Sequence, residues 1–129
     1  MPSRRTVLIT DDDNDIRLTL RAYLEDCDYR VIEAEDGLAG LAAVKKEKPD
    51  VVITDLRMPH LDGFGFIDRL KTESPRTPVI IITGTGDPAL VEEALCAGAA
   101  ACLFKPFTDL AVLASAVQHI LERSRPHDI

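Results

Sequence analysis

Residues 51–63 have the sequence VVITDLRMPHLDG, which joins an apolar strand to a polar loop and the start of a helix. The run from Val51 to Thr54 is apolar or β-branched throughout, a composition typical of a parallel strand that is covered on both faces. Asp55 follows directly, and the pairs Met58-Pro59 and Asp62-Gly63 are expected to shape the loop and begin the next helix. This segment predicts an α/β fold with a carboxylate at the end of an internal strand.

Four other segments share this strand-like character. Together with the first, the predicted strands are Val7–Thr10, Arg30–Ala34, Val51–Thr54, Val79–Thr83 and Ala101–Phe104, the last of which rests mainly on its position. Stretches between them carry apolar residues at helical spacing, for example Ile16, Leu20, Leu24 and Cys27. Strict alternation of strands and helices requires right-handed crossovers. We therefore predict a mostly parallel sheet with helices on both faces.

The boundaries of the last two helices are also marked in the sequence. Asp87 before Pro88 is typical of an N-cap followed by the first helical residue, and Gly98 lies where this helix should end. Residues 107–109 are expected to open the final helix. Its apolar stripe consists of Leu110, Leu113, Val117 and Ile120. The prediction is five strands and five helices, in alternation along the chain.

Length and composition favour one compact domain over residues 1–129, with a core at about 6–123 and a tail or the start of a linker at 124–129. The 22 acidic and 15 basic residues give a net charge of -7, which argues against direct binding of nucleic acid. No apolar stretch approaches the roughly 20 residues that span a bilayer, and no signal peptide is evident. Three cysteines without metal-site spacing indicate free thiols. We expect a cytoplasmic protein without membrane contact.

Polar side chains gather at the carboxyl ends of four predicted strands. Asp11 and Asp12 follow the first strand, Asp55 follows the third, Thr83 ends the fourth and Lys105 follows the fifth. In open parallel sheets the functional crevice lies at this edge. Adjacent carboxylates repel one another strongly, and a divalent cation removes that conflict. Because few protein oxygens are present and water can complete the shell, Mg²⁺ fits better than Ca²⁺.

Other motifs explain these residues less well. Asp13 or Asn14 alone would be assigned to capping of the next helix. An EF-hand calcium loop fails because Ile16 stands in place of its glycine and Ala22 in place of its final glutamate. The Gly-Thr-Gly at residues 84–86 lacks the Gly-Lys-Ser/Thr ending of a nucleotide-binding P-loop, so it is interpreted as a turn.

The runs VLITDDDNDIR, ITDLRMPHLDG, VIIITGTGD and LFKPF resemble, in order and spacing, the four signature regions of response-regulator receiver domains. The resemblance covers the chain from about Thr6 to Arg123. It implies a flavodoxin-like, doubly wound sheet of five parallel strands in the order 2-1-3-4-5 with five helices. Four such regions in one chain are far more specific than any one alone.

The resemblance also implies a role for individual residues. Asp55 is similar to the phosphoacceptor aspartate of the family. Asp11, Asp12 and Asp55, with the backbone carbonyl of Arg57, match the ligands of Mg²⁺. Thr83 and Lys105 match the groups that contact the phosphoryl oxygens, and the peptide bond between Lys105 and Pro106 is cis in the family. Positions that tune the switch are Thr83, Gly84, Thr85, Cys102 and Pro106.

These roles imply a signalling switch that catalyses only its own phosphorylation and slow autodephosphorylation. The donor would be a sensor histidine kinase or a histidine phosphotransfer protein. Phosphorylation would draw Thr83 inward and change the face formed by the fourth helix, fifth strand and fifth helix. That face would be recognised by a downstream protein or by an output domain outside this sequence.

One residue departs from the family pattern. Cys102 stands three positions before Lys105, where the family usually carries a Tyr or Phe that moves together with the threonine. A small thiol cannot fill that space, and its simplest interpretation is a small buried strand residue. The departure leaves open a receiver-like interaction module that is not controlled by phosphorylation. A small aspartyl-phosphate phosphohydrolase using Asp11 and Asp13 is less favoured because Asp15 breaks its motif, and a flavin-binding protein would need a phosphate loop after the first strand.

Overall fold

The computed structural model describes residues 4–58, 60–84, 88–104 and 110–124. One parallel sheet with the order β2-β1-β3-β4-β5 forms its centre, which confirms the predicted fold and strand order. The strands are β1 (Thr6–Thr10), β2 (Arg30–Ala34), β3 (Val51–Asp55), β4 (Val79–Thr83) and β5 (Ala101–Phe104). The helices are α1 (Asn14–Asp26), α2 (Gly37–Glu47), α3 (Gly63–Glu73), α4 (Pro88–Ala97) and α5 (Leu110–Ser124).

Two strands are one residue longer than predicted. β1 begins at Thr6, whose backbone N–H donates to Asp50 Oδ2 at 2.7 Å and whose carbonyl accepts from the Asp50 N–H at 2.8 Å. β3 extends to Asp55, which pairs in register with Ile82 of β4. Both additional residues are polar, so the apolar pattern of the sequence did not include them in the predicted strands. As a result, Asp55 belongs to the sheet ladder and its backbone is held in register beside β4.

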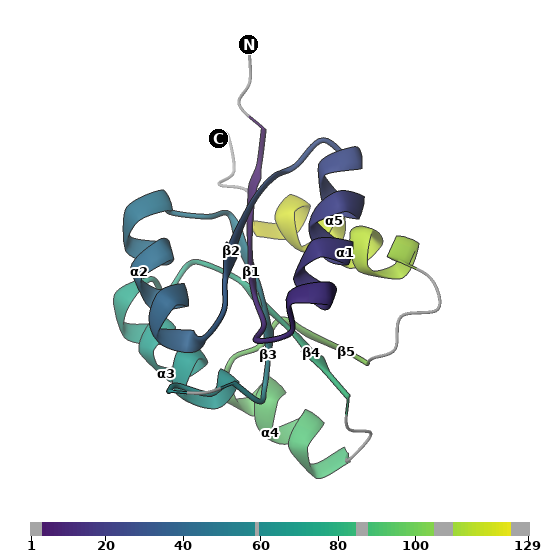
Figure 1. Cartoon of the computed structure of the whole chain (residues 1–129). Helices are drawn as coiled ribbons and strands as arrows, with labels where there is room; N and C mark the ends of the chain where they lie inside the picture. The colour runs from purple at the N-terminus through teal and green to yellow at the C-terminus, as the bar shows by residue number, and fades with distance from the viewer. Residues whose placement is uncertain (1–3, 59, 85–87, 105–109, 125–129) are drawn as a thin grey trace, which may run out of the picture.

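Helices cover both faces of the sheet, with α1 and α5 on one side and α2, α3 and α4 on the other (Figure 1). Side chains alternate along each strand, so Val51 and Ile53 pack toward α1 and α5 whereas Val52 packs toward α2 and α3. Every residue of β1, β3 and β4 is buried. Within the described residues, no helix is both long and apolar enough to cross a lipid bilayer.

Carboxylates cap the N-termini of α1, α2 and α3. Asp13, Asp36 and Asp62 are the N-caps of α1, α2 and α3, and each accepts a hydrogen bond from a backbone N–H in the first turn. The capping role expected of Asp13 is therefore confirmed. Gly98 follows α4 with a φ of +118°, as expected for a glycine that ends a helix. The predicted cap Asp87 lies outside the described residues.

Gly63 allows α3 to begin in direct contact with the end of β3. A Cβ at this position would stand 2.5 Å from the carbonyl oxygen of Asp55 and 2.7 Å from Cα of Leu56. Both neighbours are backbone atoms of a buried strand end, so they cannot move aside cheaply. The Gly63 N–H also donates to the Leu56 carbonyl at 2.9 Å.

Gly63→Ala should therefore lower the free energy of unfolding by about 3 kcal/mol, since overpacking against backbone leaves little room for relaxation. Urea denaturation followed by circular dichroism measures the change. Gly84→Ala is the matched control, because a Cβ there would meet no atom within 4 Å. We expect that control to change stability by less than about 0.5 kcal/mol. Equal effects of the two substitutions would contradict the close contact at Gly63.

Candidate functional site

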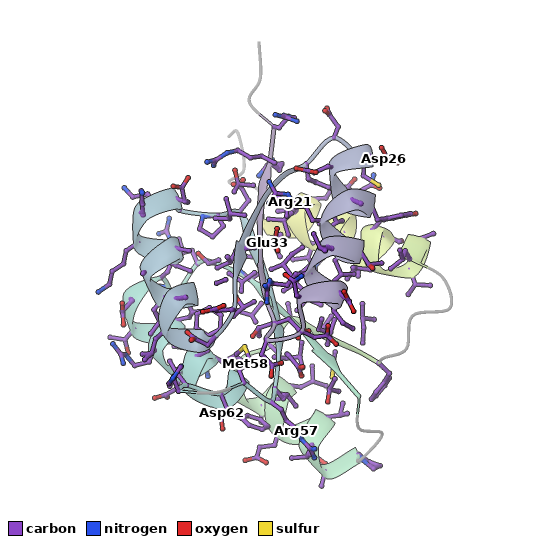
Figure 2. All side chains as sticks on the ribbon, in the orientation of Figure 1. Arg21, Asp26, Glu33, Arg57, Met58 and Asp62 are labelled. Atoms are coloured by element: carbon purple, nitrogen blue, oxygen red, sulfur yellow. The ribbon has the colours of Figure 1, made fainter. Side chains whose placement is uncertain are left out.

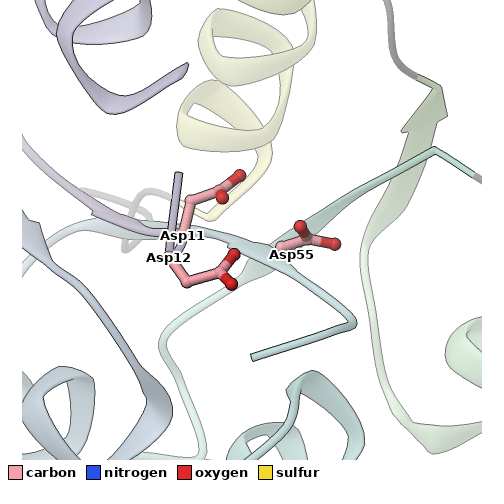
Figure 3. Close-up of side chains that lie close together, drawn as sticks. All are labelled: Asp11, Asp12 and Asp55. Atoms are coloured by element: carbon pink, nitrogen blue, oxygen red, sulfur yellow. The ribbon is translucent and has the colours of Figure 1, made fainter. Parts of the chain in front are cut away.

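Three carboxylates meet where β1 and β3 end (Figure 3). Thr10 pairs with Thr54, so the residues that follow them, Asp11 and Asp55, reach the same edge of the sheet. Asp11 is fully buried, Asp55 is 8% exposed and Asp12 is exposed. One carboxylate oxygen of each residue lies within 4.8 Å of those of the other two. The structure therefore brings together three of the residues that the sequence placed at strand ends.

The position of Asp11 is set by hydrogen bonds on both sides of its Cα. Its backbone N–H donates to the carbonyl of Ala34 in β2 at 3.1 Å. Its carboxylate oxygen Oδ1 accepts from the backbone N–H of Asp13 at 2.9 Å, and its carbonyl accepts from Arg17. This turn directs Asp11 and Asp12 to the strand end before α1 begins.

Asp55 is held by the loop that follows it. The backbone N–H of Arg57 donates to Asp55 Oδ1 at 3.3 Å. The hydroxyl of Thr54 donates to the Asp55 carbonyl at 3.0 Å and also lies 3.7 Å from the sulfur of Met58. Met58 therefore lies close to Thr54, and the start of α3 is joined to Leu56 through the Gly63 N–H.

A shallow, open depression of about 540 Å³ lies beside the carboxylates. Its lining consists of Asp12, Leu56, Arg57, Met58 and Asp62. Figure 2 shows Arg57, Met58 and Asp62 grouped where β3 passes into α3. The depression leaves the carboxylate cluster accessible from solvent on this side.

The remaining predicted site residues differ in how far they can be placed. Thr83 ends β4, the neighbour of β3, and is only 2% exposed. Gly84 follows it and is exposed. Thr85, Lys105 and Pro106 lie outside the described residues, so their predicted roles stay predictions.

Cys102 occupies the middle of β5. Its side chain is half-buried and packs against the core on the side of α2, α3 and α4. Burial raises the pKa of its thiol, so the neutral form is favoured. Cys102 therefore behaves as a strand residue, partly covered, and its thiol is not activated. The other cysteines, Cys27 and Cys96, are free and exposed.

The carboxylate cluster has the donor chemistry of a site for a hard divalent cation. Asp11, Asp12 and Asp55 offer oxygen ligands from two adjacent strand ends. Two of the three residues are buried, where repulsion between like charges is screened least. Because the side facing the depression is open, water and ligand oxygens can complete an octahedral shell, as Mg²⁺ requires.

Sequence reasoning missed a contact between this loop and α2. Asp36 Oδ1 accepts from the Ala39 N–H at 2.8 Å, and Asp36 Oδ2 lies 2.9 Å from Nδ1 of His60. His60 has a φ of +69°, a conformation uncommon outside glycine. The contact ties the loop after Asp55 to the N-terminus of α2. The hydrogen bonds from Ala39 and then His60 lower the pKa of Asp36 below its ordinary value.

The lowered pKa predicts how stability depends on pH. The folded-state pKa of Asp36 lies below the unfolded value of about 4. The ionised carboxylate therefore contributes stability that is complete above that value and is lost as the pH falls through the folded pKa. Asp36→Asn retains a capping residue, so at neutral pH it should be less stable than wild type by about 1 kcal/mol. Urea denaturation between neutral and acidic pH should show this difference shrink, and a difference that stays constant would contradict the assignment.

Comparisons with known proteins agree with this geometry. The family model described as "Response regulator receiver domain" matches residues 7–118. The DNA-binding transcriptional regulator NtrC of Salmonella typhimurium is 34% identical over 129 residues, covering 98% of this chain but only 28% of NtrC. Sporulation initiation phosphotransferase F of Bacillus subtilis is 34% identical over 115 residues, covering 89% of this chain and 92% of that protein. A receiver domain crystal structure from Clostridium thermocellum has a TM-score of 0.86 and 32% identity, covering 92% of this chain and 95% of that one.

Proposed function

Because this chain belongs to the response regulator receiver domain family, we propose that it is a phosphorylation switch whose phosphoacceptor is Asp55. The observation that carries the proposal is the cluster of three carboxylates at the ends of β1 and β3. Receiver domains are signalling switches of two-component systems. The proposed receiver fold has its core at about residues 6–123.

The proposed donor is a sensor histidine kinase or a histidine phosphotransfer protein, the partners that phosphorylate receiver domains. The open depression beside Asp12 and Arg57 supports a protein donor, since a phosphohistidine on a convex partner can reach it. The chain spans only 28% of NtrC, so any output domain or downstream protein is part of the proposal as well.

Mg²⁺ is the proposed cofactor, held by the carboxylates of Asp11, Asp12 and Asp55 and by the backbone carbonyl of Arg57. When bound, the ion supplies positive charge to the oxygens that gather negative charge during phosphoryl transfer. The carboxylates provide hard oxygen ligands, and the buried turn at Asp11 provides rigidity. The protein's own part in the reaction is then positioning.

In the proposed reaction, a carboxylate oxygen of Asp55 attacks the phosphorus of the donor. An oxygen–phosphorus bond forms, the phosphorus–nitrogen bond of the phosphohistidine breaks, and the histidine nitrogen keeps the electron pair. The fixed backbone of Asp55 in β3 and the N–H of Arg57 orient the nucleophile. Thr83 and Lys105 are proposed to contact the phosphoryl oxygens. Attack of water on the same phosphorus would reset the switch slowly.

The proposed output surface is the face of α4, β5 and α5. Phosphorylation would give the hydroxyl of Thr83 an additional acceptor and bias the loop through Gly84 and Thr85. Leu95, Phe104 and Val112 are large apolar side chains that remain exposed on these three elements. Their exposure supports this face as a protein contact. The absence of an aromatic residue at Cys102 means that Thr83 would move without the aromatic partner usual in the family.

Intact-mass spectrometry after incubation with acetyl phosphate and Mg²⁺ tests the proposal. The expected result is one added phosphoryl group, and none when EDTA replaces Mg²⁺. Release of the adduct by neutral hydroxylamine, and by both strong acid and alkali, would identify an acyl phosphate. The absence of any adduct at short and long times would overturn the proposal and favour an interaction module that is not controlled by phosphorylation.

A further inference from the structure

Arg17, on the first turn and a half of α1, contacts the turn that carries the acidic pair. Its Nη1 donates to the carbonyl of Asp11 at 2.5 Å, and its Nε donates to Glu33 Oε1 of β2 at 3.1 Å. Nη2 donates to Asn14 Oδ1 at 2.9 Å. The side chain is 12% exposed. One guanidinium therefore joins the end of β1, the start of α1 and the adjacent strand β2.

This placement of a cation has an electrostatic cost. The N-terminal end of a helix carries partial positive charge, which disfavours a basic side chain in the first turns. A proposed site for a divalent cation lies beside the same turn, which adds repulsion. Partners must offset both effects, and a planar guanidinium with several fixed donors is better suited to do so than a flexible ammonium.

Glu33 supplies the anchor for Arg17. Its second carboxylate oxygen, Oε2, accepts from Arg21 Nη1 at 2.7 Å. Arg21 also donates from Nε to Glu25 Oε2 at 3.2 Å, one helical turn further on. Figure 2 shows Arg21 of α1 and Glu33 of β2 side by side. Glu33 is thus fixed from two directions, and Arg17 is held against a rigid strand.

We infer that Arg17 is a positioning residue for the metal site, because it fixes the Asp11 carbonyl and thereby the direction of the carboxylates of Asp11 and Asp12. The inference rests on the proposed function and extends it to a residue outside the carboxylate cluster. Arg17 acts through the backbone turn and does not touch the ion or the phosphoryl group. Groups that orient metal ligands typically change metal affinity when they are removed.

A positioning role for Arg17 and its charge alone predict opposite changes in cation affinity when Arg17 is replaced. Removal of a positive charge near a cation site should strengthen cation binding when charge alone matters. Removal of the group that orders the Asp11 turn should weaken binding, because the carboxylates must then be ordered when the ion binds. Arg21 is the matched control, since it lies on the same helix and shares Glu33, and its hydrogen bonds go to Glu33 and Glu25.

The experiment titrates wild type, Arg17→Gln and Arg21→Gln with Mn²⁺, and the free ion is measured by electron paramagnetic resonance. Arg17→Gln should bind Mn²⁺ about tenfold more weakly than wild type. Arg21→Gln should stay within about twofold of wild type or bind more tightly, as expected of a charge effect alone. Arg17→Gln that binds as tightly as Arg21→Gln, or more tightly, overturns the inference.

Two further measurements separate the possible failures. The rate of phosphorylation by acetyl phosphate, measured against Mg²⁺ concentration, should show a raised half-saturation point for Arg17→Gln with a nearly unchanged rate at saturation. Should Arg17→Gln fail to fold, Arg17→Lys decides in the same way, because lysine lacks the separate Nε and Nη1 donors with which Arg17 contacts Glu33 and Asp11. If wild type itself binds no Mn²⁺, the proposed metal site is wrong. If wild type binds and the two Arg variants agree, only the role of Arg17 is wrong.

Discussion

Asp55→Asn should abolish the phosphoryl adduct that wild type forms with acetyl phosphate and Mg²⁺. The amide is a far poorer nucleophile than a carboxylate and contributes no charge to a cation site. The substitution is nearly isosteric, and the backbone of Asp55 keeps its pairing with Ile82, so the fold should survive. Intact-mass spectrometry measures the adduct, and circular dichroism confirms that the variant is folded.

Asp62→Asn is the matched control for this experiment. Asp62 lines the same depression, and it caps α3 by accepting from the Gly65 N–H at 2.9 Å. Asparagine caps a helix about as well as aspartate, so the local structure should persist. The control should therefore retain the full adduct. An adduct of equal size on Asp55→Asn, or mapping of the wild-type adduct to another residue, would show that Asp55 is not the acceptor.

The sheet was predictable because its strands carry strong local signals. β3 and β4 carry apolar residues on both faces. This pattern is expected of parallel strands whose two faces are both covered by helices. β5 is the exception, since it is an edge strand whose residues are partly or fully exposed and whose composition is weak. Its position in the alternating order identified it, and its residues alone did not. The meeting of Asp11 with Asp55 followed from topology, because the ends of adjacent parallel strands share one edge.

The supports of the site were harder to predict because they join segments that are distant in sequence. The contact of His60 with Asp36 depends on a positive φ at a residue other than glycine, for which the sequence has no clear signal. Arg17 did carry a signal. A basic residue in the first turns of a helix that follows an acidic cluster opposes the helix dipole, so it calls for a specific partner. Which partner it contacts, Glu33 of β2, depends on the three-dimensional fold.

Asp12→Asn should have opposite effects on stability with and without a divalent cation. Asp12 is one of three carboxylates that lie within 4.8 Å of one another, and it is the exposed member. In EDTA, loss of one charge relieves repulsion and should raise the free energy of unfolding by up to about 1 kcal/mol. At Mg²⁺ concentrations 100 times the wild-type dissociation constant, wild type should gain about 2.7 kcal/mol from binding. The variant, which has lost a ligand, should gain only a small part of this, so the order of stability reverses.

Urea denaturation of both proteins in EDTA and in Mg²⁺ measures these four stabilities. Asp26→Asn is the control, because it removes a carboxylate at the last residue of α1 (Figure 2), whereas the cluster lies just before the first turn of that helix. Its response to Mg²⁺ should equal that of wild type under the metal-site hypothesis, because salt screens the interaction between distant exposed charges. If Mg²⁺ stabilises Asp12→Asn as much as wild type, Asp12 is not a ligand. If the variant is also less stable in EDTA, the three carboxylates do not repel one another in the folded protein, and the reason for placing a cation among them is removed.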